Sequence, residues 1–337
     1  MTGGGRGVYA TLTAQALDTG ESIEVGVVEP GGDSDWQPRV EALLADKSPL
    51  YRQHVALAFR GGLDDLETLF YVGTVRGEPV TVAMLAGAHG AAIFGHVLTL
   101  PRWRRRGAAR VLHSALPRDW RRRGYRVVTL GTDPQGHARR LYEGIGFETL
   151  AAGRGDMIWR DGPDGGAVAE VGASEVGPLR WGDWGWVSES LCTPPEPGES
   201  LPRSPLFHVR QQRYVDWPFI AALCGDGSPR NRRAEVAVLR RGVRAVGWAA
   251  LLPATEPVLG ADALELYLRP GARSPAAAHR LLSALPWPER PVLHACTLAE
   301  DWRAGALATH GFTIRAVLPA WWDLGRGPEA AQVWIRR

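Results

Sequence analysis

The sequence holds little cysteine, a single lysine and no long apolar run. Its three cysteines, Cys192, Cys224 and Cys296, are odd in number and far apart, which fits neither a disulfide framework nor a zinc site. We therefore interpret them as reduced structural thiols and predict no bound metal. No apolar run approaches the roughly 20 residues that a membrane span needs. The N-terminus also lacks the apolar core of a signal peptide, so we expect a cytoplasmic protein without membrane contact.

The near absence of lysine leaves arginine to carry the positive charge. Lys47 is the only lysine among the 39 basic residues, and the net charge is only +3. The arginines are unevenly distributed, because ten of them and one acid, Asp119, lie between Pro101 and Arg126. Such a cluster requires an anionic partner or a well-solvated face. The length of 337 residues suits two domains of about 150 residues each.

The most informative segment is GHVLTLPRWRRRGAARVLHSA, residues 95–115. An apolar, β-branched stretch ends at Pro101, an arginine-rich turn follows, and an amphipathic helix is predicted to begin near Gly107. The first N–H groups of a helix lack intrahelical partners, and the helix dipole favours negative charge there. Since Gly107, Ala108 and Ala109 carry little or no side chain, a phosphate could approach this backbone closely. The segment therefore predicts an anion-binding site.

A second segment, ARRLYEGIGF over residues 138–147, is predicted to form a helix that ends at a glycine. In order and spacing, the two segments resemble the signatures of the GNAT superfamily of N-acetyltransferases, and the resemblance covers about residues 23–160. Arg104, Gly107 and Ala109 match its acyl-CoA pattern, Arg/Gln-x-x-Gly-x-Gly/Ala. The residues that match its second pattern, Asn-x-x-Ala-x-x-Leu-Tyr-x-x-x-Gly-Phe, are Gln135 (in place of the usual Asn), Ala138, Leu141, Tyr142, Gly146 and Phe147.

The resemblance implies an acyl-CoA donor, such as acetyl-CoA, held between two diverging parallel strands without a metal. The pantetheine amides would pair with Leu98, Thr99 and Leu100, and the Gln135 amide would bond the pantetheine arm. The pyrophosphate would accept hydrogen bonds from the turn, whose expected donor-binding residues are Arg104, Arg105, Arg106, Gly107, Ala108 and Ala109. Tyr142 matches the family tyrosine that protonates the departing thiolate, because a phenol stays protonated at neutral pH. Its alternative role is that of a packed core aromatic.

No motif identifies the general base that would deprotonate an acceptor amine. His96 lies on the strand expected to line the donor cleft and titrates in the right range, so it is our candidate. A lone histidine on a strand is also commonly a packed, hydrogen-bonded residue, and a glutamate or ordered water could serve instead. We expect His113 and His137, which lie on predicted helices, to be surface residues.

The second half of the sequence repeats the first. Residues 101–116 align without gaps with residues 270–285, and residues 132–147 align with residues 297–312. The second copy has lost three donor-site residues. Pro275 stands in the place of Arg106, Ala276 in the place of Gly107, and Leu307 in the place of Tyr142. The sequence therefore predicts two copies of one domain, of which only the first binds a donor.

The predicted fold class is α/β, with two tandem GNAT-like domains, each a mixed, mostly antiparallel sheet flanked by helices. The predicted divisions are a flexible N-terminal segment over residues 1–22, an intact domain over 23–160, a linker over 161–167 and a degenerate copy over 168–337. The tryptophans concentrated after residue 170 are expected mainly in the core, with some in an acceptor pocket.

The leading hypothesis is an acyltransferase that moves an acetyl or other acyl group from acyl-CoA directly to an amine of a small molecule, in biosynthesis, specialised metabolism or antibiotic modification. A first alternative keeps the fold but takes the acyl group from a carrier protein or an aminoacyl-tRNA. The arginines that exceed the needs of one CoA and could dock such a donor are Arg118, Arg121, Arg122 and Arg123. A second alternative is a non-catalytic CoA-binding regulatory module, against which the presence of Tyr142 argues.

Overall fold

The computed structural model divides the chain into two compact units, and each is described by itself. The described residues are 8–31, 35–150, 155–162, 173–192, 216–225, 234–252, 262–287, 293–298, 301–323 and 328–336. Unit 1 comprises Met1–Ala169, Arg180–Cys192 and Arg210–Ile220. Unit 2 comprises Glu170–Leu179, Thr193–Val209 and Ala221–Arg337. The predicted linker over 161–167 lies outside the described residues from position 163 onward.

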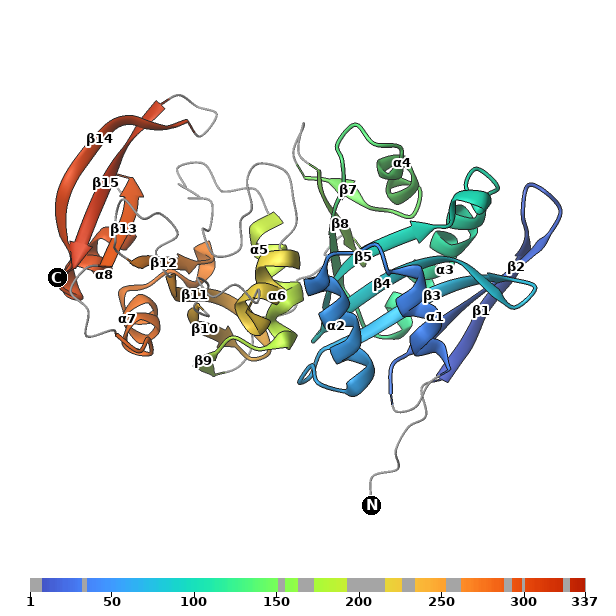
Figure 1. The fold of residues 1–337 in the computed structure, drawn as a ribbon. Helices are drawn as coiled ribbons and strands as arrows, with labels where there is room; N and C mark the ends of the chain where they lie inside the picture. Colours follow the sequence, from blue (N-terminus) through green and yellow to red (C-terminus); the bar gives the residue numbers. More distant parts are fainter. Residues whose placement is uncertain are drawn as a thin grey trace, which may run out of the picture. The chain divides into compact units, whose positions relative to one another are not determined.

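Unit 1 is built on an eight-stranded sheet in the order β1-β2-β3-β4-β5-β6-β8-β7 (Figure 1). Its strands are β1 (Val8–Ala16), β2 (Ser22–Glu29), β3 (Glu67–Val75), β4 (Glu78–Ala88), β5 (Ala91–Thr99), β6 (Val127–Gly131), β7 (Glu148–Thr149) and β8 (Asp156–Arg160). Neighbouring strands are antiparallel except β5 and β6, which are parallel. The connection between them runs through a short 3-10 turn, η1 (Pro101–Trp103), and helix α3 (Ala108–Arg122).

Helices cover both faces of this sheet (Figure 1). The helices are α1 (Trp36–Leu43) and α2 (Pro49–Arg60) on one face, and α3 and α4 (His137–Glu143) on the other. Phe59 of α2 stacks on Phe70 of β3 with ring centroids 5.4 Å apart. The strand neighbours of Phe70, Leu69 and Tyr71, belong instead to the buried cluster that contains Leu112 of α3. Because successive strand residues point to opposite faces, the sheet separates two buried layers.

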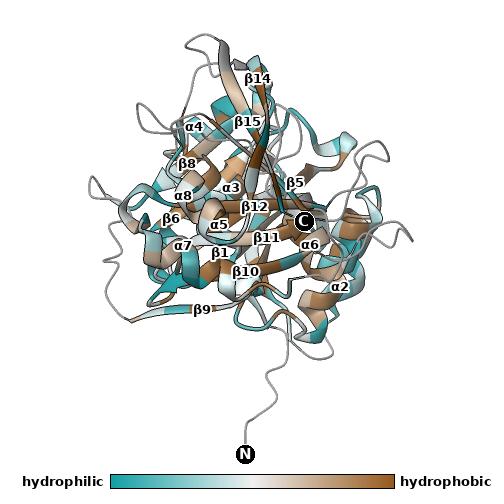
Figure 2. Ribbon diagram, turned by 90° about the vertical axis from the view of Figure 1, so that its left-hand side faces the viewer, coloured by the Kyte–Doolittle hydropathy of each residue, from teal (hydrophilic) through white to brown (hydrophobic). Residues whose placement is uncertain are grey.

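Helix α2 shows the two-sided pattern of a helix that covers one face of a sheet. Helix α2 carries both hydrophobic and hydrophilic residues along its length (Figure 2), and its buried side chains include Leu50, Val55 and Phe59. Across the described ranges, no helix combines the length and the apolar character needed to cross a membrane.

The N-terminal strand β1 corrects the expectation of a flexible segment over residues 1–22. Residues Val8–Ala16 pair antiparallel with β2 at the edge of the sheet. Tyr9 stacks on Trp36 with ring centroids 4.6 Å apart, and Leu17 is buried in the core. The alternation of apolar and threonine side chains in this stretch therefore outweighs its lack of a strong hydrophobic run.

Residues 180–192 also differ from the prediction, which assigned them to the second domain. They form η2 (Trp181–Asp183) and α5 (Trp184–Cys192), which pack within unit 1 against β4, β5, β6 and β8. A Cβ at Gly185 would lie 2.4 Å from the carbonyl carbon of Ala91, so the helix crosses β5 at backbone contact. The Ser188 hydroxyl lies 2.8 Å from that of Thr129 on β6. Because all nine residues of α5 are buried, this helix belongs to the first core.

Unit 2 holds a seven-stranded sheet in the order β14-β15-β13-β12-β11-β10-β9. Its strands are β9 (Ser174–Pro178), β10 (Glu235–Arg241), β11 (Arg244–Leu252), β12 (Asp262–Leu268), β13 (Leu293–Leu298), β14 (Thr313–Asp323) and β15 (Pro328–Arg336). The helices α7 (Pro275–Ser283) and α8 (Arg303–Thr309) follow β12 and β13, and α6 (Asp216–Cys224) is divided between the two units. Strands β12 and β13 are parallel, and each other neighbouring pair of this sheet is antiparallel.

The two sheets share their topology and local details. From β9 to β15, unit 2 repeats the strand order and directions of β2 to β8, with α7 and α8 in the places of α3 and α4. Arg104 Nε donates to the Thr99 carbonyl at 3.0 Å, and Arg273 Nε donates to the Leu268 carbonyl at 3.3 Å. The fold is thus two mixed, mostly antiparallel sheets of one design, each flanked by helices.

Candidate functional site

The strands β5 and β6 diverge soon after they begin. They pair only where Ala91–Ile93 lies beside Val127–Thr129, while β5 continues to Thr99. On its other edge β5 stays paired, because Leu98 lies opposite Val82 and the Leu100 N–H donates to the Val80 carbonyl at 3.0 Å. Past Ile93, the edge of β5 that faces β6 therefore has no strand partner among the described residues. Peptide groups that face this edge can bond an extended ligand. Of the expected residues Leu98, Thr99 and Leu100, however, the Leu100 N–H is directed to β4 and the Thr99 carbonyl already accepts from Arg104.

The turn that follows β5 presents backbone N–H groups at the start of α3. Arg105 and Gly107 are in left-handed conformations, with φ of 58° and 88°. Gly107 is the N-cap of α3, and no side chain caps this helix end. Left-handed residues in a turn direct successive N–H groups to one side and form an anion-binding concavity. Ala108 is buried and Ala109 half-buried, so small side chains keep the backbone within reach.

The corresponding turn of unit 2 is closed. Ser274 caps α7, because its hydroxyl accepts a hydrogen bond from the Ala277 N–H at 3.1 Å. Pro275 occupies the first helical position and has no N–H to offer. Of the first donors of α7, one is thus satisfied by a side chain and another is missing.

Arginine side chains surround the turn, and two of them already have acidic partners. The Arg106 guanidinium lies 5.2 Å from the Trp103 ring and 3.6 Å from Glu21. Arg110 pairs with Asp18 at 2.5 Å, and the Asp18 N–H donates to the Arg106 carbonyl at 3.1 Å. The loop between β1 and β2 therefore holds the turn in place, which sequence reasoning missed because it treated residues 1–22 as flexible.

Tyr142 lies on α4, on the α3 side of the sheet. Its ring is buried and packs edge-on against Phe94, with centroids 6.0 Å apart. It is tilted against the His113 ring at 5.6 Å between centroids. Phe94 is the first residue of β5 beyond its pairing with β6. Tyr142 is therefore both a core aromatic and a neighbour of the point where the strands separate. Gln135 is exposed in the turn before α4, and its N–H donates to the Asp133 carboxylate at 3.0 Å.

His96 lies at an irregularity of β5 on the opposite face. The register between β4 and β5 shifts in this region, and His96 is left-handed with φ of 51°. Its ring meets that of Tyr51 of α2 edge-on, with centroids 4.6 Å apart. Burial, aided by His54 and Lys47, lowers the pKa of His96 to about 3, so the imidazole is neutral at pH 7. The structure thus sets His96 and Tyr142 on opposite sides of the same strand.

His113 corrects the expectation of a surface histidine. It is fully buried on α3, where its Nδ1 hydrogen-bonds the Ala109 carbonyl at 2.6 Å, and burial lowers its pKa to about 4. Its position on the apolar face of α3, beside Leu112, could have shown this in the sequence. His137 is exposed, as expected.

The arginines at the end of α3 are largely engaged inside unit 1. Arg122 and Arg123 bind the buried Asp119 at 2.6 and 2.8 Å, and Arg121 binds Asp161 at 2.9 Å. Hydrogen bonds from Arg122, Arg123 and Tyr71 outweigh the effect of burial and hold the pKa of Asp119 below its usual range. Much of the positive charge that the sequence concentrates here is therefore compensated within the fold. In the described ranges, no group of three or more His, Cys, Asp or Glu side chains could hold a metal.

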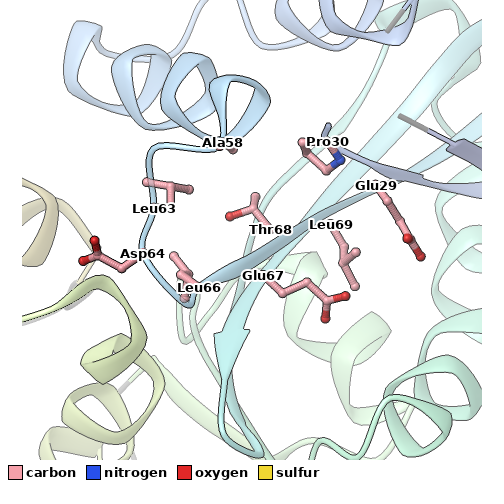
Figure 3. Close-up of a pocket in the computed structure, with 10 residues that line it drawn as sticks. Glu29, Pro30, Ala58, Leu63, Asp64, Leu66, Glu67, Thr68 and Leu69 are labelled. Carbon is pink, nitrogen blue, oxygen red and sulfur yellow. The ribbon is translucent and has the colours of Figure 1, made fainter. Parts of the chain in front are cut away.

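A pocket of about 210 Å³ lies at the opposite end of the sheet from the turn, between the end of α2 and the start of β3. Figure 3 shows Thr68 and Leu63 beside its centre, with Asp64 directed to one side and Glu67 to the other. Glu67 accepts a hydrogen bond from Arg123 at 2.7 Å, so its charge is partly compensated. This pocket lies away from the diverging strands and adds nothing to their chemistry.

A protein-family model matches part of the first unit. Residues 71–154 match the family described as FR47-like protein, a span that runs from β3 through the diverging strands, the turn, α3 and α4. This span is therefore similar to an FR47-like, GNAT-type domain. None of the curated proteins matches the sequence.

The solved structures similar to part of this chain include a GNAT domain and acetyltransferases, all of low sequence identity. The GNAT domain of S. lividans PAT is 15% identical, covers 44% of this chain and 96% of its own, and has a TM-score of 0.34. The GNAT family N-acetyltransferase YhbS from Escherichia coli, in complex with CoA, is 22% identical, with coverages of 45% and 87% and a TM-score of 0.33. The yncA protein from Salmonella typhimurium, a putative acetyltransferase with acetyl-CoA, is 16% identical, with coverages of 34% and 82% and a TM-score of 0.27.

Proposed function

We propose that this protein is an N-acyltransferase that transfers an acetyl or other acyl group from acyl-CoA to an amine of a small molecule. The observation that carries the proposal is the pair formed by the unpaired edge of β5 and the uncapped start of α3. An amide-containing arm fits the strand edge, and a diphosphate fits the turn. A molecule that joins these two groups is CoA.

In this proposal, chemistry takes place where β5 leaves β6. The amine nitrogen attacks the thioester carbonyl, its proton passes to His96, and the departing thiolate takes a proton from Tyr142. The neutral His96 is a weak base, because its pKa is about 3. It therefore accepts the proton only as the new C–N bond forms and makes the attacking nitrogen acidic.

The turn is tested by replacing Gly107. Proline at this position removes an N–H and cannot adopt a φ of 88°, so we expect Gly107→Pro to abolish acetyl-CoA binding in calorimetry. The matched control is Ala276→Pro at the corresponding place in unit 2. There Ser274 already caps the helix, and Ala276 directly follows Pro275. Circular dichroism checks that both variants fold. Binding by Gly107→Pro, or two CoA molecules per chain in the wild type, would contradict the proposal.

A carrier protein or aminoacyl-tRNA as donor remains the alternative for the same domain. Arg118 is exposed, but Arg121, Arg122 and Arg123 already have carboxylate partners, which favours a free CoA thioester. A macromolecular polyanion would make the rate fall steeply with ionic strength. We expect the transfer rate with acetyl-CoA as donor to depend only weakly on salt concentration. Transfer from tRNA or a carrier protein at a rate that falls steeply with salt would favour the alternative.

A further inference from the structure

The pocket between the end of α2 and the start of β3 contains an unpaired hydroxyl group. Thr68 is only 5% exposed, and its Oγ1 has no hydrogen-bond partner among the described residues. Thr68 lies two residues before Phe70, so both side chains lie on the face of the sheet that α2 covers. Figure 3 shows the Thr68 oxygen directed toward the side on which Leu63 lies, and both residues line the pocket. Because an unpaired buried hydroxyl is costly, a molecule in the pocket that bonds this oxygen would remove the cost.

The pocket is formed where β2 and β3 separate. Their last pair joins Val28 to Phe70, although β3 begins at Glu67. The start of β3 therefore has no strand partner on its β2 side among the described residues. The apolar residues that line the resulting space are Ala58, Leu63, Leu66 and Leu69. Its volume of about 210 Å³ is several times the roughly 30 Å³ that one water molecule takes up, so a small organic molecule fits.

The charges around the pocket are mainly negative. The carboxylates that line it are Glu29, Asp64 and Glu67. The Arg123 guanidinium binds both Glu29 and Glu67. It also binds Asp119, so one positive charge serves three carboxylates. The C-terminal end of α2, which also lines the pocket, adds the negative end of a helix dipole. The occupant that this environment favours is therefore a cation.

The arrangement of the carboxylates favours an organic cation over a metal ion. Asp64 and Glu67 are directed to opposite sides of the pocket, so they do not converge on one small ion (Figure 3). Arg60, in the last turn of α2, is exposed and stands outside the lining. An ammonium group offers three N–H donors and is attracted by carboxylates on either side of it.

We propose that the pocket binds a small molecule that carries a primary ammonium group on a short aliphatic chain. One ammonium N–H donates to the Thr68 hydroxyl oxygen, and the chain packs against Leu63 and Leu66. The site lies away from the diverging strands, and the inference does not rest on the proposed function.

The first test uses butylammonium as the probe, added without acetyl-CoA to protein whose methyl groups are labelled with ¹³C. We expect the methyl signals of Thr68 and Leu63 to shift as the amine is added. Butan-1-ol has the same chain without the charge, so it should bind at least about tenfold more weakly. Equal affinities for the two probes, or signal shifts that leave out Thr68, would overturn the inference.

The second test removes the hydroxyl. A hydrogen bond to a charged group is worth about 10- to 100-fold in affinity, so Thr68→Val should weaken butylammonium binding by that factor. Without the amine, the same variant should melt at the same temperature as the wild type or higher, because the unpaired buried hydroxyl is gone. Unchanged affinity for butylammonium in Thr68→Val would overturn the role of the hydroxyl.

The matched control is Thr74→Val on the same strand. The Thr74 hydroxyl is also buried, but it donates to the Glu24 carbonyl at 3.5 Å and lies outside the pocket. The two threonines are about 20 Å apart along β3, so Thr74→Val should leave the affinity within about twofold. It should lower the melting temperature, because a paired hydroxyl is lost. Equal losses of affinity in Thr68→Val and Thr74→Val would mean a general disturbance of β3 and would reject the site.

The third test concerns the charge. Asp64 is left-handed with φ of 48°, a conformation that asparagine also adopts, so Asp64→Asn keeps the backbone and removes one negative charge. We expect butylammonium to bind about two- to fivefold more weakly at low salt, and the difference should shrink as salt is added. A loss that is the same at every salt concentration would contradict an electrostatic role.

The pocket and the donor site are separated by the variant Gly107→Pro. This variant is expected to lose acetyl-CoA binding, and it should bind butylammonium as the wild type does. Loss of both ligands in Gly107→Pro would contradict a separate site. Failure of the wild type to bind acetyl-CoA, with butylammonium still bound at Thr68, would reject the proposed function and leave this inference in place.

Discussion

Tyr142 is the residue at which the packing and catalytic interpretations can be separated. Tyr142→Phe keeps the ring against Phe94 and removes only the hydroxyl. If the phenol protonates the thiolate, turnover should fall by about 10²–10⁴-fold while calorimetric affinity for acetyl-CoA stays the same. The control is Tyr125→Phe, which removes the hydroxyl bonded to Glu67 away from the donor site. A Tyr142→Phe enzyme with normal turnover would mean that water protonates the thiolate.

The buried histidines predict how stability depends on pH. His54 and His113 have folded-state pKa values of about 3 and 4, below the ordinary value near 6.5. Above pH 6.5 both histidines are neutral in the folded and in the unfolded chain. As the pH falls below 6.5, the unfolded chain binds protons at these histidines, and the folded chain does not bind them until the pH reaches the folded-state pKa. Stability should therefore be complete above pH 6.5 and decrease toward pH 4.

His113→Leu tests this dependence, because it removes one such proton site. Urea unfolding between pH 7 and pH 4.5 should show a slope smaller by up to about 1.4 kcal/mol per pH unit than in the wild type. An identical slope in the variant would show that His113 already binds a proton in the folded chain.

At the scale of elements, the docking of α5 depends on a glycine. A Cβ at Gly185 would meet the backbone of Ala91 and Ala92 at 2.4 to 2.8 Å, and backbone cannot move aside as a flexible side chain can. We expect Gly185→Ala to destabilise unit 1 by about 1–3 kcal/mol, measured by chemical unfolding. Gly305→Ala in α8 is the control, because no atom lies within 4 Å of its Cβ position, and it should be neutral or slightly stabilising. Equal behaviour of the two variants would contradict the close contact.

The elements that sequence reasoning predicted are those whose signals are local. The turn at Gly107, the helix that ends before Gly146 and the repeat of both in unit 2 each depend on neighbouring residues, and the structure confirms that fold. Strand β1 was missed because a composition rich in glycine and threonine predicts disorder, whereas an edge strand needs only one buried face.

The position of α5 had no local signal. It depends on segments far apart in the sequence, and the helical spacing of Tyr51 and His54 does not reveal that His96 and Trp181 lie across from them. The roles of His96, Tyr142 and Gln135 stay predictions, since packing alone does not test chemistry.

At the scale of the whole molecule, the first unit extends beyond the first repeat. We expect a chain of residues 1–192 to unfold at a higher temperature than one of residues 1–167, because only the longer one covers β5 and β6 with α5. The shorter chain should also bind a dye for exposed apolar surface. Titration of acetyl-CoA into each chain in a calorimeter shows whether the donor-binding turn is still formed. A shorter chain that melts earlier but still binds acetyl-CoA has lost stability and kept the turn. Equal melting temperatures would show that α5 contributes nothing to the first core.

The placement of α5 also has a consequence for synthesis. Residues 8–160 emerge from the ribosome before residues 181–192, so the surface of β5 and β6 that α5 covers stays exposed while the next segment is translated. Such a half-finished unit is a natural substrate for chaperones and is vulnerable to association with other nascent chains. Gene fission between the two repeats would make that transient state permanent, and this favours retention of the second copy as part of one continuous polypeptide.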